Sequence, residues 1–247
     1  MLQGKGVAAI DIGARNLIAL IGVDSEGNTF SLLFKSGTPR AYWLKCGKLA
    51  RRRQKIAYKY FWDATEHSEN NDEEKEKEFF SKYELYLRKA GRFKRKAREV
   101  RKKAVNSMCR LIAEFLVEKG VSTIYVGNSV CYCVCGEDLV EEITSKPARE
   151  LLRNFFVPPQ IINSLRRHCE VKGIQVVEVS ERGSSSRCPI CGQSVQRVYR
   201  GLIVCKDRGS FNADLAAAYN ILRENNSVKL SDNVLKNYLI TLRYTFT

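Results

Sequence analysis

The stretch "GVAAIDIGARNLIALIGVDSEGNTFSLLFKSG" (residues 6–37) decides the fold of this chain. Its apolar runs predict three strands, at 6–12, 16–23 and 28–36, and the polar "DSEGN" predicts a tight turn between the last two. Two more apolar segments, 122–128 and 174–181, follow segments with helical spacing and read as further strands. Three antiparallel strands followed by two helix–strand units predict an α/β fold: a mixed sheet with helices packed on it.

The remaining segments divide the chain. Helical spacing runs from about 41 to 117 with an interruption near 64–74, and it returns at 158–173 and 212–224. The tail shows weak helical spacing at Leu235, Tyr238, Leu239 and Leu242. The predicted parts are a first sheet segment (1–40), a basic helical insertion (41–120), a second sheet segment (121–182), a cysteine-containing segment (183–211), a final helix (212–224) and a tail (225–247).

Composition narrows the class of protein. The 247 residues are 44% hydrophobic and 28% charged, which is typical of a globular protein. No apolar run reaches the roughly 18 residues that a membrane span needs, and the N-terminus has no signal-like apolar core. We therefore expect a cytoplasmic protein with no membrane partner. Its nine cysteines then favour metal ligands and buried thiols over disulfides. The alternating "CYCVC" (131–135) predicts a buried strand face, with a metal or redox role as the alternative.

The net charge of +15 is concentrated in two segments, "KCGKLARRRQKIAYKY" (45–60) and "LRKAGRFKRKAREVRKK" (87–103). Long one-signed helical faces indicate a polyanionic partner, and nucleic acid is the usual one. The expected phosphate-binding residues are Arg51, Arg52, Arg53, Lys55, Arg92, Arg95, Lys96 and Lys102. The interleaved aromatics Tyr83, Tyr86 and Phe93 are at helical spacing, which favours helix packing over base stacking.

Asp11 is the first candidate for chemistry, because it lies inside an apolar strand. A buried ionised carboxylate needs a cation, a metal or several hydrogen bonds, although a bond to the turn at Gly13 would also satisfy it. Aspartate and glycine at this place occur in actin-like ATPases and in RNase H-like nucleases. The basic helices and the lack of downstream glycine-rich phosphate loops favour the nuclease, which uses two Mg²⁺ ions about 4 Å apart.

Such a site needs further carboxylates at the same edge of the sheet. Glu178, Glu181 and Asp214 qualify by position. Strand alternation places Glu178 on the face opposite Val177 and Val179, and Glu181 at the exit of the strand. Asp214 falls in the first turn of the final helix, where the helix dipole also favours a carboxylate.

A second candidate metal site is formed by thiols. "CPICG" (188–192) is half of a zinc ribbon, with Cys188 and Cys191 as ligands, and Cys205 begins the other half. Arg208 stands where the fourth cysteine is expected, and a cation does not bind zinc. Asp207, a distant thiol or water could complete a Zn²⁺ site, and a ribbon that has lost its metal is the alternative.

Four motifs together resemble the TnpB (OrfB) family of transposon-encoded, RNA-guided DNA nucleases, relatives of Fanzor and type V CRISPR effectors. They are "IDIGARN" (10–16), "TIYVGN" (123–128), "VEVSERGSSSRCPICG" (177–192) and "FNADLAAAYNI" (211–221). The resemblance implies an RNase H-like (RuvC) core in which Asp11 and Asp214 are the first and third catalytic acids. Many members carry the second acid at the position of Gly127. Others carry a relocated glutamate that Glu181 matches, with Glu178 as a substitute.

The family resemblance also implies a function. We expect a Mg²⁺-dependent endonuclease core that acts on DNA. We expect it to lack the family's N-terminal lobe, because the strand with Asp11 starts within ten residues of Met1. A guide-like RNA or a second chain would then complete the assembly. The alternative is a DNA- or RNA-binding protein from the same family that has lost catalysis, which Gly127 and Arg208 favour.

Overall fold

The computed structural model describes residues 6–13, 17–35, 37–128, 158–181, 183–199, 201–226 and 240–243. The chain divides into two compact units, one within 1–36 and 105–244 and the other within 37–104 and 245–247. The "CYCVC" cluster at 131–135 lies outside the described residues. Among the helices that the structure describes, none combines the length and apolar character needed to cross a membrane.

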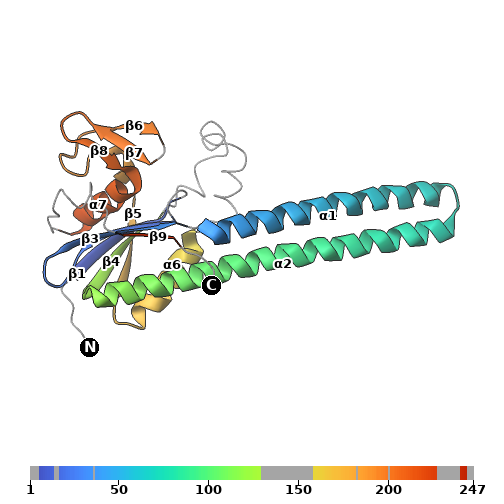
Figure 1. The fold of residues 1–247 in the computed structure, drawn as a ribbon, viewed down its shortest axis with the longest axis horizontal. Helices are drawn as coiled ribbons and strands as arrows, with labels where there is room; N and C mark the ends of the chain where they lie inside the picture. Colours follow the sequence, from blue (N-terminus) through green and yellow to red (C-terminus); the bar gives the residue numbers. More distant parts are fainter. Residues whose placement is uncertain are drawn as a thin grey trace. The chain divides into compact units, whose positions relative to one another are not determined.

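The first unit contains a mixed sheet, which confirms the predicted α/β class (Figure 1). Its strand order is β5-β4-β1-β2-β3-β9. β1 pairs antiparallel with β2, and β2 with β3, whereas β4 is parallel to both β1 and β5. The strands are β1 (Gly6–Asp11), β2 (Ile18–Val23), β3 (Thr29–Lys35), β4 (Val121–Asn128), β5 (Gln175–Ser180) and β9 (Ile240–Arg243).

The "DSEGN" turn fixes the register of the β2–β3 hairpin. The Asp24 carboxylate accepts hydrogen bonds from the backbone N–H groups of Glu26 (3.0 Å) and Asn28 (2.8 Å). Gly27 adopts a φ of 89°, which glycine reaches without a steric cost. Val23 therefore pairs with Thr29, and the two apolar strands run back in register.

Side-chain alternation gives the sheet two covered faces. Ala9 belongs to a core cluster with α7 (Ala213–Asn225), and Val7 packs against the same cluster. Ala8 and Ile10 have the opposite parity and are fully buried on the other face. Helix α6 (Pro158–Glu170) lies on that other side, so α6 and α7 sandwich the sheet (Figure 1).

A small antiparallel sheet, β6-β7-β8, precedes α7 in the chain. It is joined to β5 by the short helix η1 (Ser184–Ser186) and a cysteine-containing loop. The strands are β6 (Gln196–Tyr199), β7 (Leu202–Cys205) and β8 (Gly209–Asn212). Strands of four residues leave too short an alternation to be recognised in the sequence.

The second unit is a helical hairpin formed by α1 (Gly37–Glu69) and α2 (Glu73–Glu118), whose last turns from Val105 belong to the first unit. Buried alanines repeat every seven residues on both helices, which is coiled-coil spacing: Ala50, Ala57 and Ala64 on α1, and Ala90, Ala97 and Ala104 on α2. Across the hairpin, the ring centre of Tyr83 lies 5.4 Å from that of Phe61, and the ring centre of Tyr86 lies 5.6 Å from that of Tyr60. The packing prediction is therefore confirmed for Tyr83 and Tyr86, and for Phe93 it stays a prediction.

Two details differ from the sequence predictions. The predicted helical spacing of the tail is wrong for Ile240–Arg243, which form β9, parallel to β3. Leu32 pairs with Ile240, and the backbone of β9 thus covers an edge of β3 that would otherwise present unpaired groups. The interruption predicted near 64–74 is shorter, at residues 70–72, where Asn71 takes a positive φ of 57°.

Candidate functional site

Asp11 ends β1 and has the same parity as Val7 and Ala9, so its side chain belongs to the α7 face of the sheet. Its pKa is raised well above the usual value, first by burial, then by the charge of Asp214 and then by that of Glu181. The charge of Arg197 acts in the opposite direction. The three predicted acids therefore lie close enough to influence one another.

Glu181 directly follows β5, and its carboxylate reaches back to the neighbouring strand β4. A Cβ atom added at Gly127 would lie 2.7 Å from Oε2 of Glu181 and 2.9 Å from Cδ1 of Ile221. Ile10 pairs with Val126, so Gly127 and Asp11 lie at the same end of adjacent strands. The carboxylate of Glu181 thus occupies the space that a side chain at position 127 would need.

Asp214 lies in the first turn of α7. Asn212 caps this helix, because its side-chain oxygen accepts hydrogen bonds from the N–H groups of Asp214 (3.0 Å) and Leu215 (3.1 Å). Helix α7 packs on β1 and β2 through Ala216 and its neighbours in the core cluster. This packing brings the N-terminal turn of α7, with Asp214, to the end of β1.

Glu178, the predicted substitute, does not join this group. It points to the α6 face, where it forms an ion pair with Arg166 and accepts a hydrogen bond from Asn128 (2.8 Å). Strand alternation had placed it opposite Val179, and the structure agrees. Glu181 is therefore the better candidate for the second acid.

Asp11, Glu181 and Asp214 form what we call the carboxylate site. Several acids around the half-buried Asp11 carboxyl repel one another, and a divalent cation with oxygen ligands, such as Mg²⁺, would offset that repulsion. In the described part of the chain, their oxygens do not all lie within 4.8 Å of one another. Arg197 on β6 is a neighbour that no motif in the sequence indicated.

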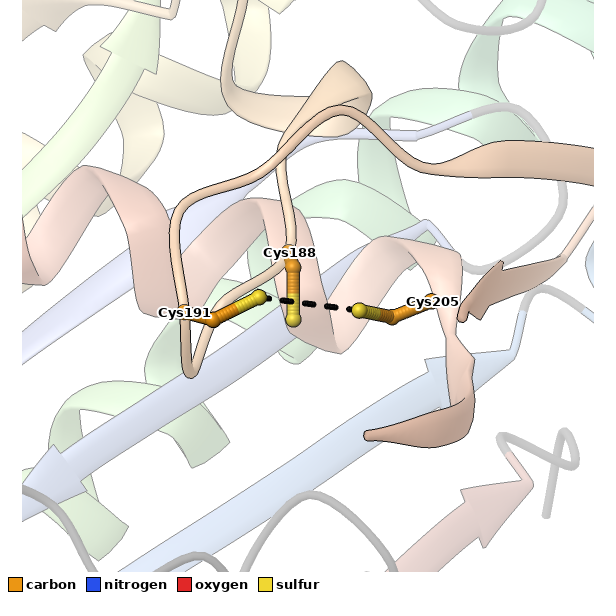
Figure 2. Close-up of side chains that lie close together, drawn as sticks. All are labelled: Cys188, Cys191 and Cys205. Carbon is orange, nitrogen blue, oxygen red and sulfur yellow. Dashed lines mark hydrogen bonds between the residues drawn. The ribbon is translucent and has the colours of Figure 1, made fainter. Parts of the chain in front are cut away.

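Cys188, Cys191 and Cys205 form the thiol cluster, whose sulfur atoms all lie within 4.8 Å of one another. Figure 2 shows the three side chains pointing toward a common centre, with the sulfurs of Cys191 and Cys205 3.6 Å apart. The backbone makes this possible: Gly192, at φ 77°, donates to the carbonyl of Cys188 (2.9 Å). This geometry suits a tetrahedral metal such as Zn²⁺.

The second half of the ribbon keeps the shape of a metal-binding turn. Cys205 pairs with Gly209, which has a φ of 83°, and the intervening Arg208 is exposed. The backbone N–H of Asp207 lowers the pKa of the Cys205 thiol, whereas burial raises that of Cys188. Asp207 is exposed, and its role as a fourth ligand stays a prediction.

Asn220 of α7 joins the two candidate sites. Its side-chain amide, fully buried, donates to the carbonyls of Ser184 (2.6 Å) and Arg187 (2.9 Å). Ser184 in turn donates its backbone N–H to the carbonyl of Glu181 (3.0 Å), and Arg187 directly precedes Cys188. One helix side chain therefore holds Ser184 and Arg187, which lie in the chain between the second acid and the first thiol.

A later turn of α7 fixes the cysteine loop itself. Arg223 donates to the carbonyl of Pro189 (3.1 Å), and Glu224 forms an ion pair with Arg187. Since α7 also carries Asp214, the carboxylate site and the thiol cluster depend on the same helix.

The predicted phosphate-binding cations lie on the helical hairpin. Seven of the eight have exposed side chains: Arg51, Arg52, Lys55, Arg92, Arg95, Lys96 and Lys102. Arg53 is partly buried, and its guanidinium lies 5.7 Å from the centre of the Tyr86 ring. Their role in binding nucleic acid stays a prediction.

The comparisons with known proteins agree with the motifs. The family described as "Cas12f1-like, TNB domain" matches residues 159–221, which include Glu181, the thiol cluster and Asp214. The TnpB-like protein ORF457 of Acidianus two-tailed virus is 26% identical over 226 residues, covering 90% of this chain and 42% of the viral protein.

A solved structure, the Cas12f1-sgRNA-target DNA complex, contains a similar fold. Its TM-score is 0.51 at 17% identity, covering 90% of this chain and 50% of that one. The chain thus spans half or less of the length of these relatives. The family match and the viral relative thus agree with the resemblance of the motifs to TnpB, and the solved structure shows that the fold is shared.

Proposed function

We propose that this chain is the catalytic core of a divalent-cation-dependent nuclease that cleaves phosphodiester bonds in DNA. One observation carries the proposal: Asp11, Asp214 and Glu181 come from three separate elements, and both other acids raise the pKa of Asp11. Three acids at one end of a sheet are unfavourable unless a cation binds there. The match of the chain's segment 159–221 to a Cas12f1-like family supports the same function.

The residues of the carboxylate site would act by binding and orienting cations. Bound Mg²⁺ supplies activation of a water molecule and stabilisation of the charge on the leaving oxygen. Glu181 reaches over Gly127, so it can share a cation with Asp11 from the neighbouring strand. Arg197 contributes a positive charge beside Asp11, which favours the approach of a phosphate.

The thiol cluster would have a structural role. We propose that Cys188, Cys191 and Cys205 bind Zn²⁺ with water or Asp207 as the fourth ligand. The bound ion would tie the cysteine loop to β7, and Asn220 connects this loop to Glu181. Zinc would thus stabilise the position of the second acid without taking part in cleavage.

The proposed partners are DNA and a guide-like RNA. The exposed cations of the hairpin, such as Arg92 and Lys96, can contact phosphates without reading sequence. The similar solved fold comes from a complex of Cas12f1 with sgRNA and target DNA. We therefore expect binding that weakens steeply as salt rises.

A nucleic-acid-binding protein without catalysis is the second candidate, favoured by Arg208 at the fourth thiol position. Gly127 no longer argues for it, because Glu181 fills the space at that position.

Calorimetric titration of the full chain with Mg²⁺ or Mn²⁺ separates the two candidates. We expect the wild type to bind cations and to cut a labelled single strand with its RNA present, and Asp11→Asn to do neither. Glu178→Gln is the matched control, since Glu178 is an acid of the same region on the opposite face. Equal cation binding and equal cleavage by Asp11→Asn and the wild type would refute the nuclease.

A further inference from the structure

The outer face of α1 presents two aromatic side chains to solvent. Trp62 is 67% exposed and Tyr58 is 49% exposed, although both are large apolar side chains. The inner side of the same helix buries Ala50, Ala57 and Ala64 against the hairpin partner. Trp62 touches the hairpin packing through an edge-to-face contact with Phe61, whose ring centre lies 5.5 Å from that of Trp62. Two thirds of Trp62 and half of Tyr58 nevertheless stay exposed to solvent.

Cations surround these two rings. At 3.6 residues per turn, six exposed side chains fall within roughly 100° of the circumference of the helix. They form what we call the basic–aromatic face: Lys48, Arg51, Lys55, Tyr58, Lys59 and Trp62. One turn beyond Trp62 the exposed Glu66 ends the positive run. A single exposed apolar side chain needs no explanation, but two aromatics between four cations form a patch of definite chemistry.

We infer that the basic–aromatic face binds unpaired nucleic acid by stacking bases on Tyr58 and Trp62. Charge complementarity selects the partner, because four cations at one face attract a polyanion and disfavour a second copy of the same face. The rings are four residues apart, which corresponds to about 6 Å along the helix axis. This spacing is close to twice the rise of about 3.4 Å per base, so bases two positions apart in a stacked strand match the two rings.

The inference rests on the proposed nucleic-acid function and adds a base-stacking site to it. Stacking requires an exposed ring face, which paired bases inside a duplex do not offer. We therefore expect a preference for single strands over duplex, which phosphate contacts alone would not produce. Single-stranded RNA and DNA share this chemistry, and both are tested below.

Fluorescence provides a direct readout, since the chain has two tryptophans, Trp43 and Trp62. In a Trp43→Phe background Trp62 is the single reporter. We expect its emission to be quenched on titration with (dT)20 or (U)20 in EDTA, and to change much less with a 20-bp duplex. EDTA removes divalent cations, so a result here is independent of whether the carboxylate site cleaves DNA.

Affinity and salt dependence separate stacking from charge. Trp62→Ala should weaken single-strand binding by about fivefold to a hundredfold, while the slope of log affinity against log salt concentration stays unchanged. Trp62→Phe should retain most of the affinity. Lys55→Ala should reduce that slope by about one unit. Phe80→Ala is the matched control, since Phe80 is 43% exposed on α2 beside Glu76 and Glu84.

Two results would overturn the inference. One is single-strand affinity that Trp62→Ala leaves unchanged, with no quenching of Trp62. The other is a wild-type dimer that Trp62→Ala converts to a monomer, because this face would then bind protein. Loss of cleavage in Asp11→Asn with normal quenching would leave the stacking site intact.

Discussion

The space above Gly127 offers the sharpest test of which glutamate completes the carboxylate site. Gly127→Ala would place a Cβ 2.7 Å from Oε2 of Glu181 and 2.9 Å from Cδ1 of Ile221. Both contacts are shorter than van der Waals distance by roughly half an ångström or more, but both involve the ends of flexible side chains. The carboxylate and the methyl group must therefore move.

The expected effect on stability is small. Overpacking a core costs about 1–3 kcal/mol. Replacing glycine by alanine in a strand stabilises the folded state by about 0.5–1 kcal/mol, because alanine loses less backbone entropy on folding. The free energy of unfolding of Gly127→Ala should therefore fall by about 0–2.5 kcal/mol in urea denaturation monitored by circular dichroism. A shift of about half an ångström in Glu181 should nevertheless weaken cation binding by about 10- to 100-fold.

The double variant Gly127→Glu with Glu181→Ala makes the test reciprocal. It moves the acid to the end of β4 and empties the space that the new side chain needs. We expect Glu181→Ala alone to lose most Mg²⁺ binding in calorimetry, and the double variant to recover a substantial part of it. If the double variant binds no better than Glu181→Ala, Glu181 does not occupy the second acidic position.

Three further predictions concern the interactions around the two sites. Burial and neighbouring charges raise the pKa of Asp11 above its usual value of 3.8, so the folded state favours the protonated carboxyl. Without metal, the free energy of unfolding should therefore fall as pH rises above 3.8, by at most about 1.4 kcal/mol per pH unit. In EDTA, Asp11→Asn should remove this fall, as urea denaturation at several pH values would show, and an identical pH dependence in both proteins would contradict it. Asn220→Ala should lower the free energy of unfolding by about 2–3 kcal/mol and weaken Mg²⁺ binding. Asn225→Ala, at an exposed turn of α7, should leave Mg²⁺ binding unchanged. Equal Mg²⁺ binding by Asn220→Ala and the wild type would contradict the positioning role of Asn220. Arg208→Cys should supply a fourth thiol and raise Zn²⁺ affinity by at least about tenfold in competition with a chromophoric chelator, and unchanged affinity would show that position 208 does not face the cluster.

Much of the fold could be predicted because the long elements have clear periodicity. The first three strands, β4, β5, α6 and α7 lie within three residues of their predicted bounds. The small sheet could not be predicted, since its strands have four residues each and depend on packing against α7. β9 could not be predicted for a related reason: its extended structure is determined by pairing with β3, which lies some 200 residues away in the sequence.

The candidate site was predictable in part. The motifs indicated Asp11, Asp214, the three cysteines and Glu181, with Glu178 as a substitute. The structure places Glu178 on the α6 face, paired with Arg166. Two features needed coordinates: the reach of Glu181 over Gly127, and the position of Arg197 beside Asp11. Both depend on how β5 and β6 lie against their neighbours, which no local pattern encodes.

The central claim is that Asp11, Glu181 and Asp214 share divalent cations. Crystals of the full chain soaked in Mn²⁺ and measured for anomalous scattering would test it most directly. The account predicts one or two anomalous peaks between Asp11, Glu181 and Asp214, each bonded to at least two of the three carboxylates, and their loss in Asp11→Asn. Peaks found only at exposed acids such as Glu73 and Glu74, with none at the end of β1, would contradict it.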